Sequence, residues 1–127
     1  MTTVSVTKCF GFEAAHYLPK YQGDCANIHG HSYKLQVTVS GKINNGMIID
    51  FSILKEIVEK FVVKEYDHTL LNLRFAVPTA ENMVQHFFTV LEQEFKEREL
   101  TLESVKLWET DSSYAECRRD QDAERLE

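Results

Sequence analysis

The chain has 127 residues, of which 43% are hydrophobic and 27% charged, and its formal net charge at pH 7 is -6. Such values are typical of one soluble globular domain that is large enough to bury a core without disulfides. The acidic charge argues against nucleic acid or an anionic membrane as the main partner. No apolar run approaches the roughly 20 residues that a membrane-spanning helix needs. Three cysteines cannot all pair within one chain, and the N-terminus shows no secretory leader, so we expect a reduced, cytoplasmic protein.

Alternation of apolar and polar residues predicts two strands in the first third of the chain. The first covers residues 3–14, and the second runs from about His31 to Lys42. Residues 17–28 contain proline, glycine, aspartate and asparagine, which favour turns. We therefore predict that this segment is a loop connecting the two strands.

Two segments with helical spacing follow. Either Asp50 or Ser52 can cap the first helix, whose apolar residues recur at helical spacing across residues 53–62. Thr79 is the predicted N-cap of the second helix, which carries a similar apolar stripe. Residues 66–77 show little periodicity, so we predict a connection without regular structure.

The last two predicted strands run from Leu102 to Glu109 and from Ser113 to Arg118. The resulting order is β-β-α-α-β-β, with antiparallel neighbours and both helices on one face, which is an α+β arrangement. We expect a single domain over residues 1–118 and a charged, solvated tail over residues 119–127.

The segment Cys25-x3-His29-Gly30-His31 carries the strongest chemical signal in the chain. Side chains two residues apart on a strand point to the same face, so His29 and His31 project together. His16 ends the first strand pattern and comes close to this pair if the two strands pair. Three imidazoles can hold zinc with one position left open. Hydrogen-bonded histidines at strand ends explain the same pattern equally well.

Other chemical candidates with open alternatives are Cys25, the Asp67-His68 pair and Glu109. Cys25 is a fourth ligand that closes the site, a base or nucleophile beside the metal, or an inert loop cysteine. Asp67 can fix the tautomer of the adjacent His68 and raise its basicity. Glu109 shares the apolar face of its strand, so its carboxylate must be exposed, paired or bound to a ligand.

Six motifs occur in order along the chain: Phe12-Glu-Ala-Ala-His16, Cys25-x3-His29-Gly-His31, Ile49-Asp50-Phe51, Asp67-His68, Pro78-Thr79-Ala80-Glu81-Asn82 and Trp108-Glu109-Thr110. Together they resemble the 6-pyruvoyl-tetrahydropterin synthase superfamily over roughly residues 4–118. Within it, the pattern is most similar to the 6-carboxy-5,6,7,8-tetrahydropterin synthase branch. The three-residue gap between Cys25 and His29 favours that branch over the pyruvoyl branch, which tends to have a longer insert.

The resemblance implies a zinc-dependent lyase that acts on 7,8-dihydroneopterin triphosphate in queuosine biosynthesis. It releases acetaldehyde and triphosphate and forms 6-carboxy-5,6,7,8-tetrahydropterin. The implied site residues are the Zn²⁺ ligands His16, His29 and His31, the catalytic Cys25, Asp67 and His68, and the substrate-binding Glu109, Thr79, Glu81 and Thr110. Triphosphate needs local cations, and the candidates are Lys20, Lys34 and Arg74. The alternatives are a pyruvoyl synthase, which only eliminates triphosphate, and a non-catalytic zinc-stabilised binding module.

The implied fold is the tunnelling fold, with a four-stranded antiparallel sheet and two helices on one face. Subunits of this family assemble through their sheets into a barrel, commonly a hexamer of two trimers. Asp67 and His68 usually complete a site that is shared between subunits. The resemblance therefore implies a homo-oligomer with active sites at its subunit interfaces.

Overall fold

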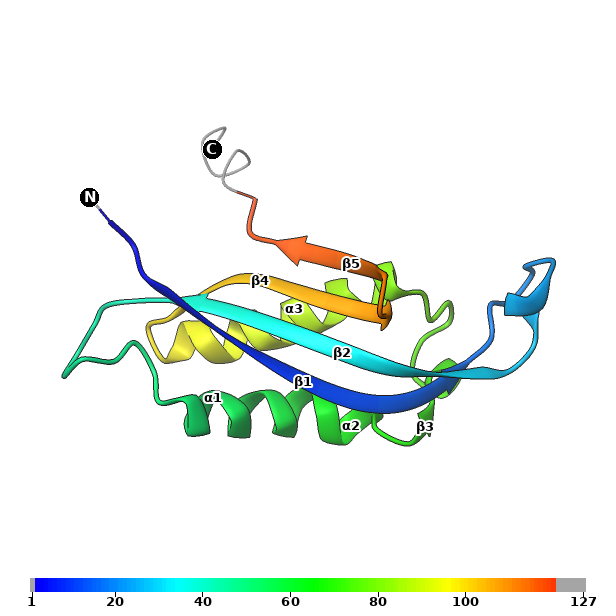
Figure 1. Cartoon of the computed structure of the whole chain (residues 1–127), viewed down its shortest axis with the longest axis horizontal. Helices are drawn as coiled ribbons and strands as arrows, with labels where there is room; N and C mark the ends of the chain where they lie inside the picture. Colours follow the sequence, from blue (N-terminus) through cyan, green and yellow to red (C-terminus); the bar gives the residue numbers. More distant parts are fainter. Residues whose placement is uncertain (1, 121–127) are drawn as a thin grey trace.

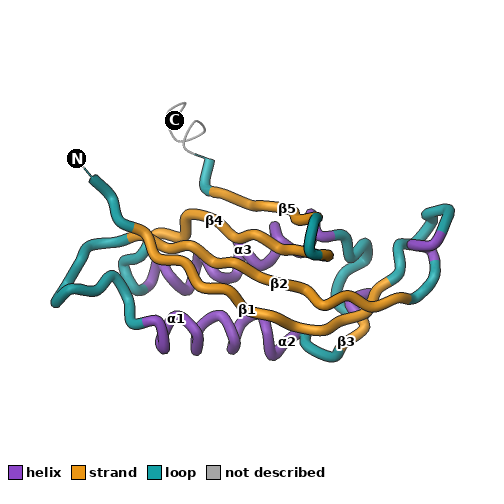
Figure 2. The backbone as a smooth tube through the Cα atoms, in the orientation of Figure 1, coloured by secondary structure: helices purple, strands orange, loops and turns teal. Residues whose placement is uncertain are grey.

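The structure is a computed structural model that describes residues 2–120 (Figure 1). One layer is a five-stranded sheet, and the helices lie together on one side of it (Figure 2). The α+β class predicted from the element order is therefore confirmed. Residues 121–127 of the predicted tail lie outside the described residues.

The strands follow the spatial order β3-β1-β2-β4-β5 across the sheet. Neighbouring strands are antiparallel except for β3, which pairs with β1 in parallel. In chain order the strands are β1 (Ser5–His16), β2 (His29–Ser40), β3 (Thr69–Leu70), β4 (Thr101–Thr110) and β5 (Ser113–Arg118).

The prediction of four antiparallel strands is wrong because of β3. This strand has only two residues, with Thr69 opposite Ala14 and Leu70 opposite Ala15. A two-residue strand contains no full period of apolar alternation, so residues 66–77 gave no strand signal. Its position next to the end of β1 matters for the site described below.

The helical segments lie between β2 and β4. The first predicted helix is a continuous helical run made of α1 (Phe51–Val58), one π-helical turn (Glu59–Val63) and α2 (Lys64–Tyr66). The second predicted helix is α3 (Ala80–Glu97). No helix within residues 2–120 is long and apolar enough to cross a membrane.

Side-chain caps start both long helices. The carboxylate of Asp50 accepts a hydrogen bond from the backbone N–H of Ser52 at 2.8 Å, so Asp50 is the cap of α1. Thr79 Oγ1 accepts from the backbone N–H of Asn82 at 3.2 Å, which confirms Thr79 as the cap of α3. These caps define the first residue of each helix.

One hydrophobic core joins the sheet to the helices. Phe12, Leu35 and Leu107 come from one face of the sheet, and Leu54 and Phe87 come from α1 and α3. The alternating parity of β1 and β2 therefore points its apolar side toward the helices, as the sequence pattern predicted. The same parity carries the histidines, which places them on the helix side of the sheet.

The ends of β1 and β2 differ from the predicted ends by about two residues, and this difference decides whether the histidines lie on strands or in the loop. β1 continues to His16 and β2 already begins at His29, because the antiparallel register holds up to the pair His16–His29. The loop of residues 17–28 extends beyond this end of the sheet (Figure 2). The histidines therefore lie on paired strands and not in the loop.

Candidate functional site

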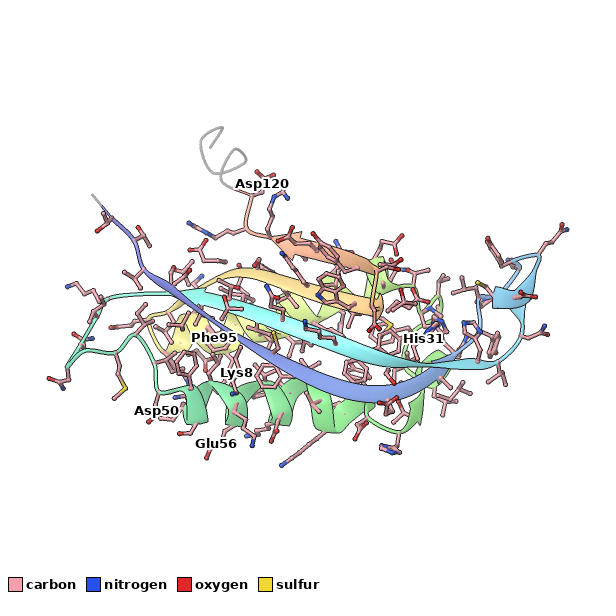
Figure 3. All side chains as sticks on the ribbon, in the orientation of Figure 1. Lys8, His31, Asp50, Glu56, Phe95 and Asp120 are labelled. Carbon is pink, nitrogen blue, oxygen red and sulfur yellow. The ribbon has the colours of Figure 1, made fainter. Side chains whose placement is uncertain are left out.

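The end of the β1–β2 hairpin places three imidazoles side by side. His16 lies opposite His29 across the two strands, and His31 lies opposite Ala14. His16 is 1% exposed, whereas His29 and His31 are partly exposed. Figure 3 shows His31 toward the end of the molecule that lies away from Asp50 and α1. The close approach that strand pairing predicted for these histidines is therefore present.

The donor atoms of this cluster converge on one point. His16 Nε2 lies 3.1 Å from His29 Nε2. The Oε1 atom of Glu109, at the end of β4, lies 2.9 Å from His31 Nε2 and 3.4 Å from His16 Nε2. All four donor atoms lie within 4.8 Å of one another. Glu109, which sequence reasoning left as exposed, paired or ligand-bound, therefore joins the histidines.

Backbone carbonyls orient two of the rings. His16 Nδ1–H donates to the carbonyl of Pro78 at 2.7 Å, and His29 Nδ1–H donates to the carbonyl of Asn27 at 2.7 Å. Each bond fixes the tautomer in which Nε2 has a free lone pair. Metal-binding histidines are commonly held in this way by a partner on the other ring nitrogen.

The residues present fit a zinc ion. Ligands bonded to one tetrahedral zinc at about 2.0–2.1 Å lie roughly 3.3 Å from each other, and three of the donor pairs are close to this, at 3.1, 2.9 and 3.4 Å. His31 Nε2 is buried and has no well-aligned hydrogen-bond partner among the described residues. Burial, and then the neighbouring His16 and His29, lower the pKa of His31, against an opposing effect of Glu109. Burial thus favours the neutral form of His31, which is the form that binds a metal.

Tyr33 forms the buried base of the cluster. Its ring lies edge-on to His16 and His31 and stacks on Phe12 at a centroid distance of 5.0 Å. Burial, with a further contribution from Glu109, raises the pKa of Tyr33 above its ordinary value. The phenol therefore stays neutral and limits the movement of the imidazoles above it.

Cys25 lies in the hairpin loop, in a short 3-10 turn (Asp24–Ala26), and is partly exposed. The turn is held to the start of the loop because Leu18 N–H donates to the Cys25 carbonyl at 2.8 Å. The converging donor set in the described part of the chain contains Glu109 and not the Cys25 thiol. The geometry therefore gives no support to Cys25 as the fourth metal ligand.

Asp67 and His68 form a pair beside β1. His68 Nδ1 lies 3.0 Å from Asp67 Oδ1 in an ion-pair contact, and the same oxygen accepts the backbone N–H of Glu13 at 2.9 Å. The hydrogen bond from Glu13, more than the contact with His68, holds the pKa of Asp67 below its ordinary value. The pair therefore contains a carboxylate that stays ionised and an imidazole whose Nε2 has no hydrogen-bond or ion-pair partner among residues 2–120.

His68 lines a surface groove that only His31 of the four cluster residues reaches. A surface groove of about 490 Å³ is lined by residues of β1, β2 and β3, including His31, Ser32 and His68. The His68 side chain is 78% exposed. It borders the groove directly before β3, so the pairing of this short strand with β1 sets the position of His68.

The remaining predicted substrate-binding residues lie outside the converging donor set. Thr79 uses its hydroxyl to cap α3, and Glu81 is exposed in the first turn of that helix. Thr110 ends β4 next to Glu109, and its hydroxyl accepts a hydrogen bond from Ser112 N–H at 3.4 Å. Within residues 2–120, Thr79, Glu81 and Thr110 make no hydrogen bond or ion pair to the histidine cluster, and their substrate-binding role stays a prediction.

The three candidate cations have different surroundings. Arg74 pairs with Glu65 at 3.0 Å and lies over the ring of Tyr66. Lys34 lies on the outer face of the sheet, 5.4 Å from the centre of the Trp108 ring. Lys20 is exposed in the hairpin loop with a φ of 62°. Because Arg74 is already paired with a carboxylate, the two lysines are better placed to meet an anion.

Sequence reasoning missed one residue that supports the site. The side chain of Asn72 makes two hydrogen bonds to the backbone of Tyr17, accepting from its N–H at 3.0 Å and donating to its carbonyl at 2.9 Å. The Asn72 side-chain amide therefore satisfies the backbone of the residue that directly follows His16 at the end of β1. No sequence signal marks it, because the two residues are 55 positions apart.

The chain was compared with known proteins. A family profile described as 6-pyruvoyl tetrahydropterin synthase matches residues 5–120. The chain belongs to this family. An Archaeoglobus fulgidus relative is 41% identical over 109 residues, which is 85% of this chain and 90% of the relative. The 6-carboxy-5,6,7,8-tetrahydropterin synthase of Haemophilus influenzae is 36% identical over 138 aligned positions, covering 87% of this chain and 96% of that protein.

Solved structures agree with this family membership. The 6-pyruvoyl tetrahydropterin synthase of Caenorhabditis elegans superimposes with a TM-score of 0.80 at 26% identity, covering 94% of this chain and 98% of that one. The tetrahydropterin synthase family predicted from the six motifs is therefore confirmed. The near-complete coverage of each relative also shows that the candidate site lies within the shared part of the fold.

Proposed function

We propose that the protein is a zinc-dependent lyase of the 6-carboxy-5,6,7,8-tetrahydropterin synthase type. Its substrates are 7,8-dihydroneopterin triphosphate and one water molecule, and its products are the carboxy-tetrahydropterin, acetaldehyde and triphosphate, for queuosine and related 7-deazapurine synthesis. The observation that carries the proposal is the convergence of three imidazole Nε2 atoms and the Glu109 carboxylate at the end of the β1–β2 hairpin. The names of relatives that are 36–38% identical to this chain support the carboxy branch.

The chemistry divides between the metal and the protein. A zinc ion held by His16, His29 and His31 supplies a Lewis acid that polarises the side-chain hydroxyls of the substrate. The Cys25 thiolate accepts or returns a proton at Sγ on one side of that side chain. His68 does so at Nε2 on the other side, because its Nδ1 is paired with Asp67.

Glu109 has a separate role in this proposal. A carboxylate can accept two parallel N–H bonds from the amino-pyrimidine edge of a pterin. The Glu109 side chain is 31% exposed at the end of β4, so it can be reached by a ligand from solvent. Thr79, Glu81 and Thr110 lie around this end of the fold and assist in binding the ring, while Lys20 and Lys34 attract the triphosphate.

The proposal also includes assembly into a homo-oligomer, with a hexamer as the expected size. Within the described residues, β3 covers only Ala14 and Ala15 of the outer edge of β1, and β5 forms the other edge of the sheet. Open strand edges pair readily with another chain. Joining of these edges between copies would close a barrel and bring a second subunit to the exposed His68. Native mass spectrometry measures the subunit number directly, and a monomer as the active species would contradict this part.

The deciding experiment is a product assay. Zinc-loaded protein is incubated with 7,8-dihydroneopterin triphosphate, and the products are followed by mass spectrometry. The proposal expects acetaldehyde together with the carboxy-tetrahydropterin. Triphosphate release with the three-carbon side chain retained would instead identify a pyruvoyl synthase, the second candidate, which the similarity to the C. elegans enzyme favours.

Two variants test the role of the thiol. Cys25→Ala should retain zinc and lose turnover, because the thiol acts beside the metal and not on it. Cys9→Ala is the matched control, since Cys9 is exposed on β1 away from the cluster and should leave turnover unchanged. Full activity of Cys25→Ala would show that the proposed role is wrong. X-ray absorption that finds sulfur bound to zinc would favour the closed binding module.

A further inference from the structure

The segment before α3 presents a carbonyl to the metal cluster. The Nδ1–H of His16 donates to the carbonyl of Pro78 at 2.7 Å, across 62 positions of sequence. His16 is 1% exposed, so water cannot replace this partner. The hydroxyl of Tyr33 is the other polar group beside Nδ1, and at 3.4 Å it is too distant for a strong bond. The orientation of His16 therefore depends on where the Pro78 carbonyl points.

The direction of the Pro78 carbonyl is fixed by two hydrogen bonds that the preceding carbonyl, that of Val77, accepts. Thr79 N–H donates to the carbonyl of Val77 at 2.9 Å, which closes a three-residue γ-turn with Pro78 at its centre. Proline suits this place because its ring holds φ near about −65°, close to the value of an inverse γ-turn. The side chain of Asn82 also donates to the Val77 carbonyl, at 2.9 Å.

The start of α3 connects this turn to the helix. The backbone N–H of Asn82 donates to the side chain of Thr79, while its amide group reaches back to Val77. Asn82 thus holds both ends of the turn that surrounds Pro78. Helix capping requires only the bond from the Asn82 backbone N–H to Thr79. The bond from the Asn82 side chain to the Val77 carbonyl is not needed for the cap, and it stabilises the turn.

We propose that Asn82 is a positioning residue for the metal site, acting through Val77 and the Pro78 carbonyl on the tautomer of His16. This inference rests on the proposed function, since it assigns His16 to a zinc ion. By holding the turn, Asn82 keeps the proton on Nδ1 and the lone pair of Nε2 directed at the cluster. Partners of this kind, beyond the ligands themselves, change metal affinity by about 10-fold to 100-fold.

The variant that tests this is Asn82→Asp, which has the same shape but no N–H to donate to Val77. An acidic residue is favourable in the first turn of a helix, so α3 should still form. Thr79→Ala is the matched control: it removes the cap bond at the same helix end and leaves the Asn82–Val77 bond in place. Both variants are measured as full chains without metal and with zinc.

Two readouts separate positioning from simple stabilisation. With ¹⁵N-labelled histidine and no metal, His16 should be the Nδ1–H tautomer in the parent and in Thr79→Ala, and a mixture of tautomers in Asn82→Asp. Zinc affinity measured by competition with a chelator should fall about 10-fold or more in Asn82→Asp, and by less than about 3-fold in Thr79→Ala.

An Asn82→Asp variant with parental tautomer and parental zinc affinity would overturn the inference, whatever its melting temperature. Equal losses of affinity in both variants would also overturn it, because helix stability would then explain the effect. If the parent itself binds no zinc, the proposed function fails, whatever the variants show. The tautomer measurement still decides the positioning role, because it needs no metal.

Discussion

Removal of one imidazole should separate metal binding from folding. His29 contributes Nε2 to the cluster, and its other ring nitrogen is bonded to the carbonyl of Asn27. We expect His29→Ala to abolish the stabilisation that zinc gives to the folded protein. The unfolded chain cannot hold these donors together, because they come from β1, β2 and β4, so bound zinc adds directly to folding stability.

The size of the effect follows from mass action. With free zinc at 100 times its dissociation constant, the free energy of unfolding rises by about 2.7 kcal/mol. For a domain of this size, about 3–4 °C of melting temperature corresponds to each kcal/mol, so the expected shift is roughly 10 °C. At the same zinc concentration, His29→Ala should shift by less than about 2 °C, since losing one of three imidazole ligands lowers the zinc affinity and the stabilisation falls with that affinity.

Differential scanning fluorimetry with and without zinc measures both shifts. The comparison uses the zinc-induced shift of each variant, because His29→Ala also loses the bond to Asn27 and melts lower without metal. His86→Ala is the control, since His86 is exposed on α3 outside the cluster and should keep the full shift. A His29→Ala variant with the parental shift would refute the assignment of the cluster as the zinc site.

Two further predictions concern the fold. Leu35→Ala removes a fully buried side chain of β2 and should lower the free energy of unfolding by about 2–5 kcal/mol, measured by urea denaturation. The backbone N–H of Ser52 lowers the pKa of Asp50 from its ordinary value of 3.8. The stabilisation by ionised Asp50 is therefore complete above that value and is lost as the pH falls below it. Asp50→Asn still caps the helix but does not titrate, so it should lose less stability than the parent between pH 5 and pH 3, and equal losses would contradict this.

Periodicity made much of the fold predictable. Strict alternation marked β1 and β2 and assigned their apolar sides to the core, and that parity also placed the histidines on one face. The preference of helix starts for side chains that accept a backbone N–H identified Thr79 and narrowed the first cap to Asp50 or Ser52, of which the structure shows Asp50. Antiparallel pairing then brought His16 to His29, because a hairpin register extends to the ends of its strands.

Contacts without a local pattern could not be predicted in this way. β3 is too short to show a period, although it carries His68 to the edge of the groove. The bonds from Asn72 to Tyr17 and from His16 to the Pro78 carbonyl join positions 55 and 62 residues apart. A backbone carbonyl leaves no trace in residue identity, so only the folded chain shows that Pro78 serves the site.

The candidate site combines segments that secondary structure alone would not hold together. The hairpin end supplies the imidazoles, the end of β4 supplies Glu109, and the turn before α3 supplies the carbonyl that orients His16. The imidazoles and Glu109 are side chains near the ends of paired strands, and the Pro78 carbonyl lies just before the N-cap of α3. A site built from such ends therefore depends on the packing that brings α3 and β4 to the hairpin, which is why zinc binding and folding stability should change together.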